Sequence, residues 1–167
     1  MALYNSIQDY SKGSTEDYMI FCLSKDFLAV QVEKVTEVLP FQEITQVPNS
    51  SEDVLGIFNL RGEILTLVDL GKHFSQPVDL NISPAIIVFV MEYLSRQIQF
   101  AVPVKNIQGV VKVKSSEISK IPEIGKNMNS ELMTGGINFE NQFVLILDIE
   151  KFISKSLEKT NKAAYGI

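Results

Sequence analysis

Two aspartates, Asp69 and Asp148, carry the side chains best suited to acid and base chemistry in this sequence. Each ends an apolar run, and paired carboxylates can share acid and base work in hydrolytic enzymes. An Asp at the end of a strand also commonly caps the next turn. The two runs belong to an internal repeat, and equivalent positions in two related subdomains tend to face away from a common site. We therefore expect two caps rather than a catalytic pair, and we predict no enzyme activity.

Other reactive side chains are sparse. His73 is the only histidine, and no group of Cys, His and carboxylate residues has the spacing of a transition-metal site, so we expect a surface or rim histidine. Cys22 is the only cysteine and lies between Phe21 and Leu23, which favours a small buried hydrophobe. Gly135-Gly136 lacks the Lys and Ser/Thr of a phosphate-binding loop. The sequence predicts no metal site and no cofactor.

The composition argues against two classes of binding partner, nucleic acids and the membrane interior. The chain has 167 residues, a net charge of −5, scattered Lys and Arg residues and no tryptophan, which argues against a nucleic-acid binder. No apolar run is long enough to span a bilayer, and residues 1–14 lack the basic and apolar regions of a signal peptide. We expect a cytoplasmic protein that binds no nucleic acid and does not insert into the membrane.

The most distinctive local pattern lies in residues 54–74. Two apolar runs flank Arg61-Gly62, and Gly62 tolerates the positive φ that a tight turn requires. This pattern predicts a β-hairpin with Arg61 held near a rigid bend.

A carboxylate is expected to lie close to this arginine. If the strand at residues 32–39 runs beside the strand at 54–60, Glu37 can approach Arg61, with Val35 as an apolar floor beneath the pair. The plain alternative is an exposed ion pair of little energetic consequence.

An internal repeat organises the whole chain. Residues 27–39 align with residues 99–111 at a constant offset, and farther along Gly56 answers Gly136 and Asp69 answers Asp148. Each half carries about five short β-branched runs separated by Gly, Pro, Asn and Ser, which is typical of a small antiparallel barrel. We predict two barrels that share an apolar seam.

The expected boundaries follow from this repeat. We assign residues 1–14 to a flexible tail, 15–80 to the first barrel, 81–148 to the second and 149–167 to a C-terminal helix and tail. The first strand of one half could pair into the other barrel, so the division near residue 80 is approximate.

The sequence resembles the CheW family of chemotaxis coupling proteins. The most recognisable motif is Asn59-Leu60-Arg61-Gly62, and Asp69-Leu70 ends the matching segment. Upstream, further matches lie at Val35, Glu37, Val38, Thr45, Val47, Pro48 and Gly56. Residues 85–153 read like the second half of the family.

The resemblance implies a mostly β fold of two pseudo-repeated, SH3-like five-stranded barrels with a C-terminal helix. It implies an adaptor that couples transmembrane chemoreceptors to the histidine kinase CheA, in arrays at the inner face of the membrane, and that could assemble in rings with CheA or with itself. The chemoreceptor tip would meet Val35, Glu37, Asn59 and Arg61, and the regulatory domain of CheA would meet Ile44, Val47 and Gly56.

The sequence leaves three alternatives open. The nearest is the same kind of adaptor in a chemosensory pathway for pili or surface motility. The second is a small-ligand-binding or hydrolytic β-barrel that uses Asp69 and Asp148, which predicts a closed pocket and a raised carboxyl pKa. The third is nucleic-acid binding by the barrels, for which the charge balance is wrong.

Overall fold

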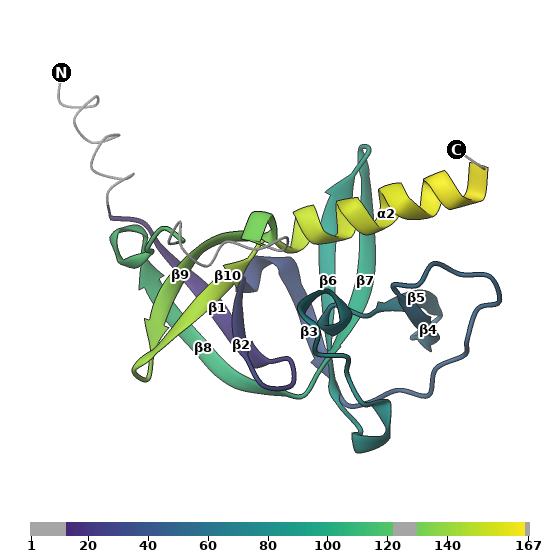
Figure 1. The fold of residues 1–167 in the computed structure, drawn as a ribbon, viewed down its shortest axis with the longest axis horizontal. Coiled ribbons are helices and arrows are strands. Elements are labelled where there is room, and N and C mark those ends of the chain that lie inside the picture. Colours follow the sequence, from purple (N-terminus) through teal and green to yellow (C-terminus); the bar gives the residue numbers. More distant parts are fainter. Residues whose placement is uncertain (1–12, 122–129, 166–167) are drawn as a thin grey trace.

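The computed structural model describes residues 13–121 and 130–165, with side chains as far as Glu158. Most of the expected N-terminal tail, residues 1–14, lies outside the described residues, as do residues 122–129 and the last two residues. The described part is mainly β-structure with one C-terminal helix (Figure 1). Its elements are β1 (Thr15–Cys22), β2 (Phe27–Gln31), β3 (Val35–Leu39), β4 (Val54–Leu60), β5 (Glu63–Val68), β6 (Ala85–Tyr93), β7 (Arg96–Val104), β8 (Asn106–Lys114), β9 (Met133–Phe139), β10 (Gln142–Leu147) and α2 (Ile149–Tyr165), with short 3₁₀ helices η1 (Val32–Lys34), η2 (Gly71–Phe74), η3 (Leu80–Ile82), η4 (Ser115–Glu117) and η5 (Ser130–Leu132).

Two-residue turns close three of the hairpins. In β4–β5, β6–β7 and β9–β10 the two central residues are Arg61-Gly62, Leu94-Ser95 and Glu140-Asn141. All six have positive φ, between 47° and 90°. Positive φ at both positions marks the type I′ turn, whose twist matches that of the strands it joins. Each hairpin therefore has a fixed register, and the residue at its tip has a fixed direction.

The strands form two five-stranded sheets, each of which curls into a small barrel. The terminal barrel takes strands from both ends of the chain, in the order β8-β1-β2-β10-β9, and the central barrel has the order β3-β6-β7-β5-β4. Outside the named strands, Thr45 bridges to Ile57 in the central barrel and Ser119 bridges to Gly136 in the terminal barrel. The predicted fold class, two SH3-like barrels with a C-terminal helix, is confirmed.

The boundary expected near residue 80 does not separate the two barrels. The first two strands of each half pair with the last three strands of the other half, because β2 lies parallel to β10 and β7 lies parallel to β5. The predicted repeat itself is confirmed by the register: Ala29 lies opposite Ile146, and Ala101 lies opposite Leu67. The chain therefore exchanges strands between its halves, and the central barrel is one contiguous segment, residues 35–104.

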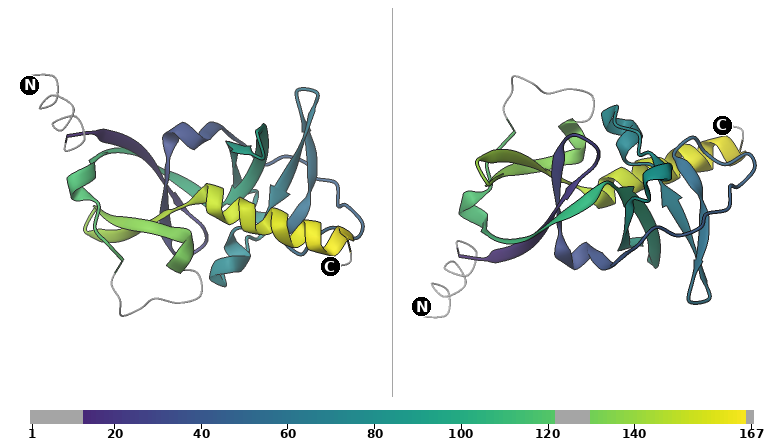
Figure 2. Two further views of the ribbon diagram at one scale, coloured as in Figure 1. Left: turned by 90° about the horizontal axis from the view of Figure 1, so that it is seen from above. Right: turned by 90° about the horizontal axis from the view of Figure 1, so that it is seen from below.

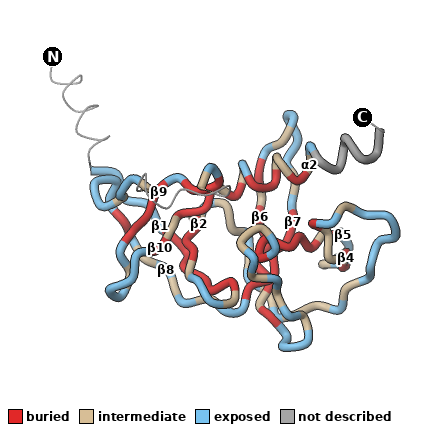
Figure 3. Tube along the Cα trace, in the orientation of Figure 1, coloured by how far each residue is buried: buried red, intermediate tan, exposed pale blue. Residues whose placement is uncertain are grey.

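The described residues form a core of three parts, and the largest part lies between the barrels. We call this part the seam cluster; it includes Met19 and Phe21 of β1 and Ile87 and Phe89 of β6. The residues between them on the same strands point the other way, into a barrel interior, as Ile20 does in the terminal barrel. Strands β1 and β6 are thus buried on both faces for much of their length (Figure 3). This explains why they are continuous apolar runs rather than alternating ones, and it confirms the predicted seam.

Helix α2 begins at the terminal barrel, where two ion pairs hold it. Glu150 accepts a hydrogen bond of 2.6 Å from Lys34 of η1, which joins β2 to β3. Lys155 pairs with Glu131 of η5, immediately before β9. Figure 2 shows α2 leaving the terminal barrel and running along the central barrel. Within the described residues, no helix is both long and apolar enough to cross a membrane.

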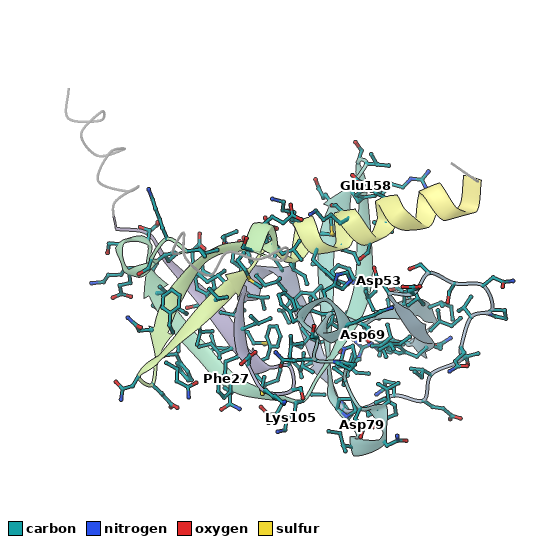
Figure 4. The ribbon with its side chains drawn as sticks, in the orientation of Figure 1. Phe27, Asp53, Asp69, Asp79, Lys105 and Glu158 are labelled. Atoms are coloured by element: carbon teal, nitrogen blue, oxygen red, sulfur yellow. The ribbon has the colours of Figure 1, made fainter. Side chains whose placement is uncertain are left out.

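The same turns of α2 also dock on the central barrel. The Phe152 ring meets His73 of η2 edge-on, with ring centroids 5.0 Å apart. The Ser156 hydroxyl donates to Asp53 Oδ2 at 3.2 Å, and His73 Nε2 lies 3.0 Å from Asp53 Oδ1. Asp53 is buried and lies directly below α2 in Figure 4. Helix α2 therefore contacts both barrels and holds them together.

Candidate functional site

The β4–β5 turn places Arg61 at the tip of its hairpin, as predicted. Arg61 has φ 50° and Gly62 has φ 90°, so the arginine itself also occupies the left-handed region. The Asn59 side chain braces the turn, because its Oδ1 accepts the Gly62 N–H at 2.9 Å. The structure thus gives Asn59, one of the expected receptor contacts, a defined part in shaping the turn.

The predicted Glu37–Arg61 pair is present. Arg61 Nη2 donates to Glu37 Oε1, and this hydrogen bond is the main cause of a raised Arg61 pKa. The arginine side chain is 69% exposed and the glutamate side chain 29%. An ion pair this exposed adds little stability. Its charge and hydrogen-bonding groups remain available to a partner at the surface.

The route by which the two residues meet differs from the expected one. Strands β3 and β4 are not hydrogen-bonded neighbours, because they form opposite edges of the central sheet. They approach one another because the sheet curls into a barrel, and the Glu37–Arg61 pair spans the resulting gap between the two edges. The pair therefore lies on the rim of the central barrel.

Val35 does not form a floor beneath this pair. The register of β3 on β6 shifts between Val35 and Glu37, so Val35 lies opposite Phe89 and Glu37 lies opposite Val88. Phe89 and Val88 are consecutive, so their side chains point to opposite faces of β6. Val35 is half-buried against the seam cluster, whereas Glu37 shares the face of the central-barrel interior. The expected floor was wrong because one extra residue in β3 reverses the alternation.

Gly56, one of the expected kinase contacts, is buried where the segment after β3 meets β4. Thr45 and Ile57 exchange two backbone hydrogen bonds of 2.8 Å beside it. A Cβ at position 56 would lie 2.7 Å from the Thr45 carbonyl oxygen. Glycine is required here so that the two backbones can approach.

The other two expected kinase contacts differ in exposure. Ile44 is half-buried and packs against the interior cluster of the central barrel. Val47 is 36% exposed and lies in the connection between β3 and β4. Of Ile44, Val47 and Gly56, only Val47 offers an exposed side chain to a partner.

The terminal barrel keeps this architecture but not the charged pair. Gly109 follows the same register shift in β8 that Glu37 follows in β3, and the turn carries Glu140-Asn141 in place of Arg61-Gly62. The counterpart of Gly56 is Gly135 rather than the expected Gly136, because a Cβ at Gly135 would lie 2.8 Å from the Ser119 carbonyl oxygen. The two barrels therefore share a backbone plan and present different rims.

The match to a known family covers most of the chain. Residues 17–157 match the model of the CheW-like domain. The chain belongs to the CheW-like family. The predicted resemblance is thereby confirmed. Its central motif, Asn59 to Gly62, forms the turn that places Arg61 on the rim of the central barrel.

Individual relatives agree with this assignment. The CheW-like chain is 24% identical over 139 residues to the chemotaxis protein CheW of Klebsiella aerogenes, covering 83% of this chain and 82% of that protein. It is 25% identical over 140 residues to CheW of Bacillus subtilis, covering 84% and 88%. Among solved structures, the scaffolding protein TtCheW of Thermoanaerobacter tengcongensis superposes with a TM-score of 0.66 at 22% identity, covering 80% of this chain and 89% of that one.

Each of the two aspartates caps the turn that follows its strand in this CheW-like chain, as expected. Asp69 Oδ1 accepts the Lys72 N–H at 3.1 Å at the start of η2, and Asp148 Oδ1 accepts the Lys151 N–H at 3.0 Å at the start of α2. Burial raises the pKa of Asp69 above its ordinary value. The two residues follow strands of different barrels, and each serves its own helix. A raised carboxyl pKa was one mark of the enzyme alternative, but the caps account for both carboxylates.

His73 and Cys22 have structural roles. The His73 ring is half-buried at the edge of the α2 contact, a rim position as expected, and faces Asp53. Cys22 is 6% exposed, and burial raises the pKa of its thiol. In the part of the chain that the structure describes, no three His, Cys, Asp or Glu side chains are grouped as metal ligands would be.

Two features of this region escaped the sequence analysis. The Asp53–Ser156 hydrogen bond joins residues 103 positions apart, and neither residue belongs to a recognisable motif. The extra residue in β3, Thr36, leaves no local signal because Val35 to Leu39 reads as an ordinary strand. The internal repeat aligns β3 with β8, but this alignment reveals the extra residue only when the strands that pair with β3 and β8 are known.

We predict that Gly56→Ala and Gly135→Ala each lower the free energy of unfolding by about 1–3 kcal/mol, because each added Cβ meets a carbonyl oxygen on an adjacent backbone. Urea titration followed by circular dichroism would measure both. Gly109→Ala is the comparison for Gly56→Ala, because the two glycines have similar positive φ (152° and 159°) but a Cβ at Gly109 meets nothing within 4 Å. Equal stability of Gly56→Ala and wild type would show that the segment near Thr45 moves aside at little cost.

We predict that Asp69→Asn changes how stability depends on pH. The pKa of Asp69 is raised in the folded chain, so its charged form disfavours folding at neutral pH and this penalty disappears on protonation. The wild type should therefore gain stability relative to Asp69→Asn as the pH falls from 7 through the raised pKa toward 3.8. Urea titrations at several pH values would measure the difference. A constant difference across this range would contradict the prediction.

Proposed function

We propose that this chain is a non-enzymatic chemotaxis adaptor that couples the cytoplasmic tips of transmembrane chemoreceptors to the histidine kinase CheA. The family match supports the adaptor role, and the proteins it resembles include chemotaxis proteins and a scaffolding protein. The observation that carries the receptor part is the Glu37–Arg61 pair on the rim of the central barrel. Arg61 lies within Asn59-Leu60-Arg61-Gly62, the most family-like motif of the sequence, and the exposed ion pair adds little stability of its own.

The receptor would meet this rim. Arg61 presents a charged fork at a turn with fixed backbone geometry, Asn59 braces that turn, and Glu37 orients the guanidinium. A guanidinium held in place loses little freedom when it binds, so its hydrogen bonds can be specific. Val35 would contribute through the seam cluster, by holding β3 against β6.

The regulatory domain of CheA would meet the connection after β3. Val47 supplies the exposed apolar contact there, while Ile44 and Gly56 hold the connection against the barrel. Receptor and kinase would then occupy different parts of the central barrel and bind at the same time. In a cytoplasmic array on the inner face of the membrane, weak contacts of this kind gain strength from effective concentration. Rings formed with CheA or with further copies of this chain would use the same principle.

We predict that Arg61→Glu weakens binding to a chemoreceptor cytoplasmic-tip fragment at least tenfold, because it places two carboxylates together and removes the donor. Isothermal titration calorimetry would measure it, with the CheA regulatory domain titrated in parallel. Arg96→Glu is the matched control, since it makes the same charge change at another exposed arginine near a hairpin turn. Wild-type receptor affinity in a folded Arg61→Glu variant would remove this rim from the receptor site.

We predict that Val47→Glu weakens binding to the CheA regulatory domain about tenfold or more while receptor-tip binding remains within twofold, because a charge would have to be buried in an apolar contact. Ile82→Glu is the matched control, since Ile82 is 59% exposed on a different connection. Equal loss of CheA binding in both variants would argue against a specific contact at Val47.

A further inference from the structure

The extra residue in β3 decides where the Glu37 carboxylate points. In a regular strand, residues two apart share a face, so Glu37 would lie on the same face as Val35, toward Phe89 and the seam cluster. The register shift between Val35 and Glu37 instead sets Glu37 opposite Val88, on the face of the barrel interior. Such a β-bulge re-aims the side chains that follow it. The Glu37–Arg61 pair depends on this one irregularity.

Thr36 is the residue inserted by the bulge, and its side chain bonds across it. The Thr36 hydroxyl donates to the Val88 carbonyl oxygen at 3.2 Å. Val88 is fully buried and lies opposite Glu37. The hydroxyl therefore links the inserted residue to the position that faces Glu37.

The terminal barrel offers a comparison within the same chain. Strand β8 has the same shift against β1, with Ile107 opposite Phe21 and Gly109 opposite Ile20. The inserted residue there is Gln108, and its side-chain amide donates to Asn106 Oδ1 on its own strand. Gly109 has no side chain to aim. The bulge occurs in both barrels, but the threonine hydroxyl across it and the carboxylate after it occur together only in the central one.

We propose that Thr36 is a positioning residue for the receptor-binding rim. Its hydroxyl holds the β3 bulge in the form that turns Glu37 toward Arg61, so the receptor meets an assembled ion pair rather than two independent charges. This inference rests on the proposed function, since it assumes that the Arg61 rim is the receptor site. It assigns a role to a side chain whose hydrogen bond is to the Val88 carbonyl oxygen of β6.

The test is a set of titrations with the chemoreceptor cytoplasmic-tip fragment, using the full chain. Thr36→Val keeps the shape of the side chain and removes the hydroxyl, and it should weaken binding about tenfold. Thr36→Ser keeps the hydroxyl and should bind within twofold of wild type. Gln108→Val, at the matching bulge of the terminal barrel, should also bind within twofold. Titration with the CheA regulatory domain shows that each variant is folded.

A double-mutant cycle separates positioning from general loss of structure. Because Thr36 acts through Glu37, Thr36→Val should add less than a twofold loss in a Glu37→Gln background. A full further tenfold loss in that background would overturn the proposal. Wild-type affinity of Thr36→Val, beside lost binding in Arg61→Glu, would also overturn it while leaving the proposed receptor site intact. Wild-type affinity in Arg61→Glu as well would overturn both.

Discussion

Burial of the seam between the two barrels is the interaction on which the rest of the structure depends. A barrel of this size encloses few side chains, and such a small core gives limited stability by itself. Here β1 and β6 serve two cores at once, since one face of each strand lies in a barrel and the other in the seam cluster. Helix α2 covers this cluster with Phe152 and Ile153. The barrels are thereby held in one relative orientation, which fixes the direction in which the charged rim faces.

Local patterns predicted the parts of the molecule that depend on neighbours in sequence. The Arg61-Gly62 turn, the C-terminal helix and the repeat all follow from spacing and residue type. The Glu37–Arg61 pair was also predicted, but from two strands running side by side, whereas β3 and β4 are opposite edges of the central sheet. The exchange of strands was not predictable in the same way. Because the two halves carry nearly the same apolar pattern, β2 fits beside β5 or β10 by local criteria, and in the structure it pairs with β10.

Errors at the site arose from shifts of a single residue. The bulge at Thr36 moved Val35 to the opposite face from the ion pair, and a one-residue difference in the repeat made Gly135, not Gly136, the counterpart of Gly56. Strand periodicity is two, so one inserted residue reverses every later inward and outward assignment. A single sequence does not reveal such an insertion, because the inserted residue fits a strand as well as its neighbours do.

The exchange of strands also sets an order in which the molecule can be completed during synthesis. The central barrel is contiguous, so all of its strands are available once Val104 has left the ribosome. The terminal barrel begins first, with β1 and β2, but its third strand follows the whole central barrel and its fifth ends at Leu147. The β1–β2 hairpin therefore lacks its partner strands β8 and β10 until later in synthesis, but one of its faces can already pack on the nascent central barrel. The barrel that carries the charged rim can act as the template on which the other one closes.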